Sequence, residues 1–261
     1  MDNKKEAMQL HRELRGKLEI KARTKTDSAQ ALALAYTPGV AQACLAIQED
    51  PDQAYALTRK WNLVAVVSDG TAVLGLGDIG GLAGMPVMEG KSILFKNFAN
   101  VDAFPICLAT KDTEEIIQTV KNIEPCFGGI NLEDIKAPKC FEIEQRLSQE
   151  LDIPVFHDDQ HGTAIVVLAA VINSLKLVGK KLEEVRIVMS GAGAAGMAIL
   201  HLLSLEGARD VIFVGRKGIL DTDYYDDPYR KKLLAQCNPH HVQGGMEEAL
   251  TGADIFIGVS G

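Results

Sequence analysis

One glycine-rich segment restricts the fold of this chain more than any other feature. Residues 185–189 form a short apolar run, and residues 190–196 read SGAGAAG before a second apolar run begins. This is the GxGxxG pattern in a strand–turn–helix setting, where glycines allow a tight turn, close approach of the backbone to a pyrophosphate, and close packing of the helix. The segment predicts a Rossmann-like dinucleotide site rather than a purely structural turn. The expected cofactor-binding residues are Gly191, Gly193, Ala194, Ala195 and Gly196.

The strand expected next, at residues 210–214, ends without the acidic residue that usually binds the ribose hydroxyls of NAD. Gly215 stands in its place, and Arg216 and Lys217 follow as further candidate cofactor-binding residues. The two cations could meet the 2′-phosphate of NADP, or they could be ordinary solvated charges at a loop. A missing acid permits a 2′-phosphate without requiring it. The sequence therefore leaves both NAD and NADP open and favours NADP only slightly.

Two acidic pairs each follow a predicted strand. Glu133 and Asp134 follow the first of these strands, and Asp158 and Asp159 follow the second. Because the carboxyl ends of successive parallel strands lie on one rim of a sheet, these carboxylates are expected to lie close together. A divalent cation would relieve their mutual repulsion. Ligands that are all oxygen atoms indicate Mg²⁺ or Mn²⁺ rather than Zn²⁺.

The second acidic pair also has a simpler interpretation. Gly162 and Thr163 open an apolar, alanine-rich run that predicts a helix to about Val178. Aspartate and threonine are favoured helix caps, so Asp158 and Asp159 could serve only to cap this helix. Taken alone, the pair does not decide between a cap and a binding site.

Several less specific segments complete the expected architecture. Residues 71–76 predict a strand before a glycine-rich loop, and residues 240–243 predict a short strand late in the chain. Lys91 is expected at the start of a helix, where a lysine is normally a solvated charge. Tyr36 precedes a Thr-Pro-Gly turn, where a tyrosine is most often packed in the core or at its rim. Position alone makes neither residue catalytic.

Composition narrows the class of protein. The chain has 261 residues, enough for two domains, and 27 Lys and Arg against 35 Asp and Glu give a formal charge of −8. That balance argues against nucleic acid or an anionic membrane as the main partner. The start of the chain is charged, and the longest apolar run, Thr163–Ile172, is shorter than a membrane span. Five cysteines without CxxC spacing indicate reduced thiols and a cytoplasmic location.

Together, these motifs resemble those of the malic enzymes, in particular the compact bacterial type. The resemblance covers essentially the whole chain and rests on several specific segments. These are YTPGV at 36–40, SDGTAVLGLGDIGGLAGMPVMEGK at 68–91, NLEDI at 131–135, HDDQHGTA at 157–164 and SGAGAAG at 190–196.

The resemblance implies a reaction and a metal site. The reaction would be oxidative decarboxylation of L-malate to pyruvate and CO₂, with reduction of NAD or NADP and with Mg²⁺ or Mn²⁺ as the metal. The ligands would be Glu133, Asp134 and Asp159, and Asp158 would support the site.

The resemblance also implies an acid–base pair and an assembly. Tyr36 would be the general acid, and Lys91 would be the general base or its close partner. The protein would be a cytoplasmic homodimer with small-molecule substrates. Larger eukaryotic members carry an arginine for the second substrate carboxylate where this chain has Ala72, so that contact is left unassigned.

The expected fold is α/β. A substrate and metal domain over residues 1–160 would precede a Rossmann-like NAD(P)-binding domain over residues 161–261. Family members continue beyond the equivalent of residue 261, so the second domain is expected to be incomplete. Two rival interpretations follow: a non-catalytic fragment that keeps the fold and part of the nucleotide binding, and an amino-acid dehydrogenase on a related fold. The dehydrogenase would have no need of three metal-type carboxylates.

Overall fold

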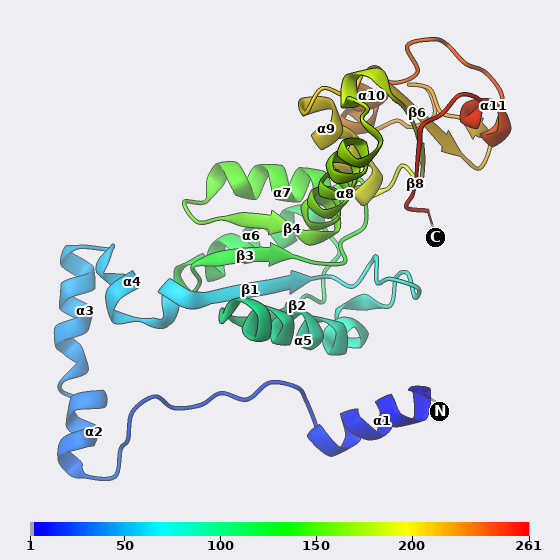
Figure 1. The fold of residues 1–261 in the computed structure, drawn as a ribbon. Coiled ribbons are helices and arrows are strands. Elements are labelled where there is room, and N and C mark those ends of the chain that lie inside the picture. Colours follow the sequence, from blue (N-terminus) through cyan, green and yellow to red (C-terminus); the bar gives the residue numbers. More distant parts are fainter. Residues whose placement is uncertain (1–2, 261) are drawn as a thin grey trace. The chain divides into compact units, whose positions relative to one another are not determined.

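The computed structural model describes residues 3–260, which form two compact units built from separate segments of the chain (Figure 1). The first unit contains the residues up to Thr71 together with Asp78–Asn131 and Leu147–Val155. The second contains Ala72–Gly77, Leu132–Arg146 and the residues from Phe156 onward. Helices alternate with strands through most of the chain, so the predicted α/β class is confirmed.

The elements up to the first acidic pair are α1 (Asn3–Leu14), α2 (Ala29–Ala35), α3 (Val40–Glu49), α4 (Gln53–Leu57), β1 (Leu63–Ser68), α5 (Gly80–Ala99), β2 (Asp102–Cys107), α6 (Thr113–Ile123) and β3 (Gly129–Leu132). The later elements are α7 (Lys139–Glu150), β4 (Val155–His157), α8 (Asp158–Val178), β5 (Arg186–Ser190), α9 (Ala194–Leu205), β6 (Asp210–Gly215), β7 (Gly218–Ile219), α10 (Pro228–Leu234), α11 (Met246–Leu250) and β8 (Ile255–Gly258).

The first sheet has the strand order β2-β1-β3-β4. β1 and β2 pair in parallel, with Leu63 opposite Asp102 and Ser68 opposite Cys107. Residues 65–67 of β1 are fully buried, and α5 packs against β1 and β2. A continuous apolar run is typical of a parallel strand that is covered on both faces. Because β3 and β4 are neighbours, the two acidic pairs that follow them begin side by side.

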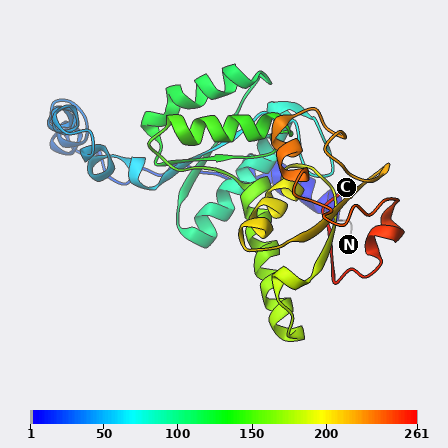
Figure 2. The same cartoon turned by 90° about the horizontal axis from the view of Figure 1, so that it is seen from above.

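The second sheet has the strand order β7-β6-β5-β8 and lies within the second unit. β5 pairs in parallel with β6 and with β8, and residues 187–189 of β5 are fully buried. α8 and α9 pack against each other beside it (Figure 2). Val188, Ile212, Val214 and Ala249 form a buried apolar cluster between β5, β6 and α11. This core fixes β5, and the glycine-rich turn leaves the sheet at its end.

The prediction of a strand at residues 71–76 is wrong. These residues form turns closed by one isolated antiparallel bridge between Val73 and Gly77. Gly75 and Gly77 have positive φ angles of 75° and 72°, which glycine adopts easily and which reverse the chain direction. The apolar residues suggested a strand, but the glycines between them set the local conformation.

The structure also differs from three other predictions about helices and strands. α5 begins at Gly80, so Lys91 lies past the middle of that helix and not at its start. α8 begins at Asp158, four residues before the predicted Gly162, and it ends at Val178 as predicted. Residues 240–243 are irregular, and the unpredicted short strand is β7, which forms a hairpin with β6.

Candidate metal and dinucleotide sites

The first acidic pair lies at the end of β3. The strand ends at Leu132, which is fully buried, and Glu133 and Asp134 follow with only 6% and 5% of their surfaces exposed. Asp134 has a left-handed backbone, with φ of 53°, and its carbonyl oxygen accepts a hydrogen bond from Ala72 N–H at 2.9 Å. Such a backbone is uncommon outside glycine and persists where the surroundings hold it. The turn therefore holds two carboxylates at low exposure.

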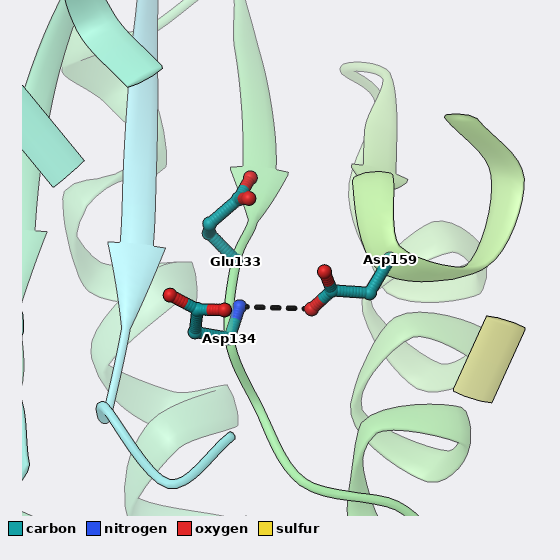
Figure 3. A group of neighbouring side chains, drawn as sticks. All are labelled: Glu133, Asp134 and Asp159. Carbon is teal, nitrogen blue, oxygen red and sulfur yellow. Dashed lines mark hydrogen bonds between the residues drawn. The ribbon is translucent and has the colours of Figure 1, made fainter. Parts of the chain in front are cut away.

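The third carboxylate, Asp159, comes from the first turn of α8. Its Oδ2 accepts a hydrogen bond from the backbone N–H of Asp134 at 3.0 Å (Figure 3). His157 is fully buried, and its Nε2 lies 3.6 Å from the same oxygen. The N-cap residue of α8 is His157 and not an aspartate. Asp159 thus reaches across to the turn after β3, which capping of its own helix does not require.

Glu133, Asp134 and Asp159 converge as predicted. One carboxylate oxygen from each lies within 4.8 Å of the others (Figure 3). Oxygen ligands around Mg²⁺ lie about 2.0–2.1 Å from the ion, so small side-chain rotations would bring all three oxygens onto one cation. Glu133 and Asp134 are buried and Asp159 is partly buried, and carboxylates this close together repel one another unless a positive charge offsets them. The donor set therefore fits a hard divalent cation.

Asp158 begins α8 and lies against Gly162 of the same helix. A Cβ atom added to Gly162 would lie 2.2 Å from Asp158 Oδ1. The present position of the Asp158 carboxylate therefore requires glycine one helical turn later. Its role as a supporting residue stays a prediction.

A second polar group, which no sequence motif indicated, lies next to this cluster. Glu144, on α7, accepts a hydrogen bond from Gln160 Nε2 at 2.9 Å and lies 2.5 Å from His161 Nε2. The hydrogen bond to Glu144 raises the pKa of His161, and partial burial opposes the shift. The sequence contains only a weak signal for Glu144. It is an acidic residue that directly follows Ile143, a buried residue of an amphipathic helix.

The glycine fingerprint has the predicted strand–turn–helix context. Gly191 follows β5 with φ of 107°, and Gly193 is the N-cap residue of α9. A Cβ atom at Gly196 would lie 1.9 Å from the carbonyl oxygen of Gly191, so the helix approaches the turn closely only because this residue is glycine. Within residues 3–260, the space around a Cβ at Gly193 is open to 4 Å. Gly193 therefore leaves room for a ligand at the start of α9, with Ala194 and Ala195 as its first helical residues.

Arg216 and Lys217 form the turn of the β6–β7 hairpin. Gly215 pairs with Gly218 across it, which leaves the two cations as the connecting residues. A Cβ atom at Gly215 would lie 2.6 Å from Leu220 Cδ2, so the side-chain direction at this position leads toward a buried leucine. An acid at position 215 would therefore have to displace Leu220.

The predicted acid–base residues lie in the first unit. Tyr36 is the C-cap residue of α2 and is 68% exposed, which does not match the simpler expectation of a packed aromatic residue. Lys91 is partly buried in α5. The carboxylates lie in the second unit, so the catalytic roles of Tyr36 and Lys91 stay predictions. Ala72, in contrast, lies within the second unit and contacts the turn at Asp134.

Family comparisons cover both halves of the chain. The N-terminal domain of malic enzyme matches residues 15–148, and the NAD-binding domain of malic enzyme matches residues 160–244.

Individual proteins give the same result. The chain is 59% identical to the NAD-dependent malic enzyme of Geobacillus stearothermophilus, over 94% of this chain and 52% of that protein. It is 51% identical to the NADP-dependent malic enzyme of Haemophilus influenzae, over 94% of this chain and 32% of that protein. The crystal structure of NAD-dependent malic enzyme from Thermotoga maritima matches with a TM-score of 0.95 and 53% identity, over 98% of this chain and 68% of that chain. The chain thus spans about half of the first relative and about a third of the second.

The glycine geometry predicts opposite effects for two alanine substitutions. Gly193→Ala should leave the free energy of unfolding unchanged or slightly higher, because the position is open and its φ of −81° suits alanine. It should weaken binding of NAD or NADP about tenfold, since a methyl group would occupy the space proposed for the pyrophosphate. Gly196→Ala should lower the free energy of unfolding by about 1–3 kcal/mol through overpacking.

Urea unfolding and calorimetric titration with the dinucleotide measure the two effects on the same samples. If Gly193→Ala binds the dinucleotide as the unchanged chain does, the open space at this position is not the cofactor site.

Proposed function

The chain belongs to the malic enzyme family, and on that basis we propose that it is an NAD(P)-dependent oxidoreductase that converts L-malate to pyruvate and CO₂. The observation that carries the proposal is the convergence of three carboxylates, from two neighbouring strand ends, at one point. A dinucleotide site alone would fit many dehydrogenases. The additional oxygen-only cluster fits a reaction that needs a hard divalent cation.

The proposed ligands are Glu133, Asp134 and Asp159, and Asp158 is proposed to support them. These residues would hold Mg²⁺ or Mn²⁺, which would supply Lewis-acid stabilisation of negative charge on the substrate oxygens. The buried ends of β3 and β4 hold the carboxylates in place before substrate arrives, which lowers the cost of organising the site.

The proposed proton transfers use two residues of the first unit. Lys91 would accept the proton of the malate C2 hydroxyl, and NAD or NADP, when bound, would supply the acceptor for the hydride from C2. After CO₂ has left, Tyr36 donates a proton to the carbon that becomes the methyl group of pyruvate. These steps account for one hydride and two proton transfers, and the family resemblance of YTPGV and MEGK supports them.

For the cofactor we propose that Arg216 and Lys217 favour NADP when they contact its 2′-phosphate. Their place at the turn of the β6–β7 hairpin, directly after a strand parallel to β5, supports the proposal. Relatives named for NAD and for NADP both match the chain, so the family alone does not choose between the two.

A homodimer is the proposed assembly. The helices α1–α4 contain no buried residue within the described part of the chain, and large apolar side chains such as Leu34 and Leu45 are exposed. A second copy of the chain would cover this surface. Sedimentation velocity tests the assembly, and a monomer throughout the micromolar range would contradict it.

We further propose a cytoplasmic protein that acts on small molecules, without a nucleic acid or membrane partner. The formal charge of −8 supports the first exclusion. Two segments, Ala29–Glu49 and Asp158–Val178, are long and apolar enough to cross a membrane by length and composition. The second of these forms α8, which packs against α9, and core helices of globular proteins pass the same test. A membrane-flotation assay would place the chain in the soluble fraction if the proposal holds.

The proposed activity is tested by malate-dependent reduction of NAD or NADP, in this chain and in a chimera continued after residue 261 with the matching part of a longer relative. The chimera should require Mg²⁺ or Mn²⁺ and lose activity with EDTA. Asp159→Ala should lower kcat by at least about 10–100-fold, the loss typical of residues that only orient a metal ligand, since it removes a ligand itself. If the helix-cap interpretation is right, Asp159→Ala lowers only stability, by about 1 kcal/mol. Activity in the chimera alone would support the interpretation of this chain as a non-catalytic fragment.

The acid–base assignment predicts different losses for two substitutions in the chimera. Tyr36→Phe should retain hydride transfer better than proton delivery to the enol, whereas Lys91→Ala should damage both steps by about 10²–10⁴-fold. NAD(P)H formation from malate reports the first step, and exchange of pyruvate methyl protons in D₂O reports the second. A Tyr36→Phe enzyme within about twofold of the unchanged chimera in both assays would show that the hydroxyl is not the general acid.

The cofactor proposal predicts that removing Arg216 weakens the use of NADP but not that of NAD. Arg216→Ala in the chimera should lower kcat/KM for NADP about 10–100-fold, because a charge-assisted hydrogen bond contributes about 1.5–3 kcal/mol. The value for NAD should stay within about twofold, and the exposed Lys232→Ala serves as the control cation. If kcat/KM falls equally for both cofactors, Arg216 does not distinguish NADP from NAD.

A further inference from the structure

Two segments supply the proposed metal ligands, and a second polar contact joins these same segments. The turn with Glu133 and Asp134 continues into α7, whereas Asp159 lies in the first turn of α8. The Asp134 N–H to Asp159 hydrogen bond is the first contact between them. Glu144 of α7 makes the second contact, with the two residues that follow Asp159 in the sequence.

The two carboxylate oxygens of Glu144 contact different partners. Oε2 accepts from Gln160 Nε2 at 2.9 Å, and Oε1 lies 2.5 Å from His161 Nε2. Only 2% of Gln160 and 13% of the Glu144 side chain are exposed, so water competes little for the contact between them, whereas the His161 side chain is 44% exposed. Hydrogen bonds to an ionised group are among the stronger ones, particularly at low exposure. One side chain therefore restrains two consecutive residues of the first two turns of α8.

Glu144 is itself well anchored. Its neighbour Ile143 is fully buried, as is Cys140 one turn earlier on α7. Phe141 stacks on Tyr229 of α10, with ring centroids 4.4 Å apart. The helix that carries Glu144 is therefore held by packing, and Glu144 can impose a position on α8.

We propose that Glu144 is a positioning residue for the cation site. By holding Gln160 and His161, it sets the distance between the start of α8 and α7, and with it the place of the Asp159 carboxylate beside Glu133 and Asp134. The inference rests on the metal site of the proposed function. Residues that orient ligands from outside the ligand set typically change metal affinity about 10–100-fold when they are removed.

The experiment is titration of the metal-free chain with Mn²⁺, followed by the electron paramagnetic resonance signal of free Mn²⁺. Glu144→Ala should raise the Kd about tenfold or more. Glu144→Gln, which keeps the shape and one acceptor oxygen, should have a smaller effect. The matched control is Glu142→Ala on the same helix, where the side chain is 57% exposed and pairs only loosely with Arg146 at 3.5 Å. Its Kd should stay within about twofold.

A second comparison tests the route of the effect. In a chain that already carries Gln160→Leu and His161→Leu, adding Glu144→Ala should change the Mn²⁺ affinity little, because the contacts through which Glu144 acts are gone. A full additional loss would mean that Glu144 acts on the cation by another route, and would overturn the proposal.

The thermal midpoint of the metal-free chain separates positioning from general stability. If Glu144→Ala and Glu144→Gln lower this midpoint but bind Mn²⁺ like the unchanged chain, Glu144 only stabilises helix packing and the inference is wrong, while the proposed function stands. If Glu144→Ala does not fold, Glu144→Gln decides. If the unchanged chain binds no Mn²⁺, or if Asp159→Ala binds it equally well, the metal site fails and the inference fails with it.

Discussion

The mutual repulsion of Glu133, Asp134 and Asp159 is the main constraint that the structure of the second unit has to satisfy. One oxygen from each carboxylate lies within 4.8 Å of the others, and two of the three residues are buried. Like charges at this spacing and exposure are unfavourable unless donors or a cation offset them. The fold provides one donor directly, the Asp134 backbone N–H, and it places that donor in an uncommon left-handed turn. The ends of the strands and the first turn of the helix around the cluster thus hold together three carboxylates that would otherwise move apart.

The main features of the fold followed from the sequence because they rest on short-range patterns. The apolar runs of β1 and β5 and the glycines after β5 identified parallel strands and a dinucleotide turn. Those patterns depend on local geometry, in which a helix repeats about every 3.6 residues and a strand every two. Residues 71–76 do not follow these local patterns. Their apolar side chains suggested a strand, but the conformation of the glycines among them depends on the turn that the whole loop has to make.

The candidate site was only partly predictable for a related reason. The acidic residues stood next to each other in pairs, and the topology of parallel strands brought the pairs together. Glu144 had no such signal, because its partners Gln160 and His161 lie on another helix and contact it only after α7 and α8 have packed. Likewise, nothing in the sequence showed that the side-chain direction at Gly215 leads to Leu220. Contacts of this kind depend on tertiary packing, which propensity and spacing do not encode.

The hydrogen bond between Asp134 and Asp159 also has a consequence for the order in which the chain folds. Its two residues are only 25 positions apart, whereas the contact from Arg186 N–H to Asp254, which ties the second sheet together, spans 68 positions. The entropic cost of closing a loop rises with its length, and contacts of short sequence separation form sooner. The β3–α7–β4 crossover and the first turns of α8 contain all three carboxylates and the Glu144 contacts. During synthesis, the ribosome therefore adds all three carboxylates and Glu144 before it reaches the glycine fingerprint.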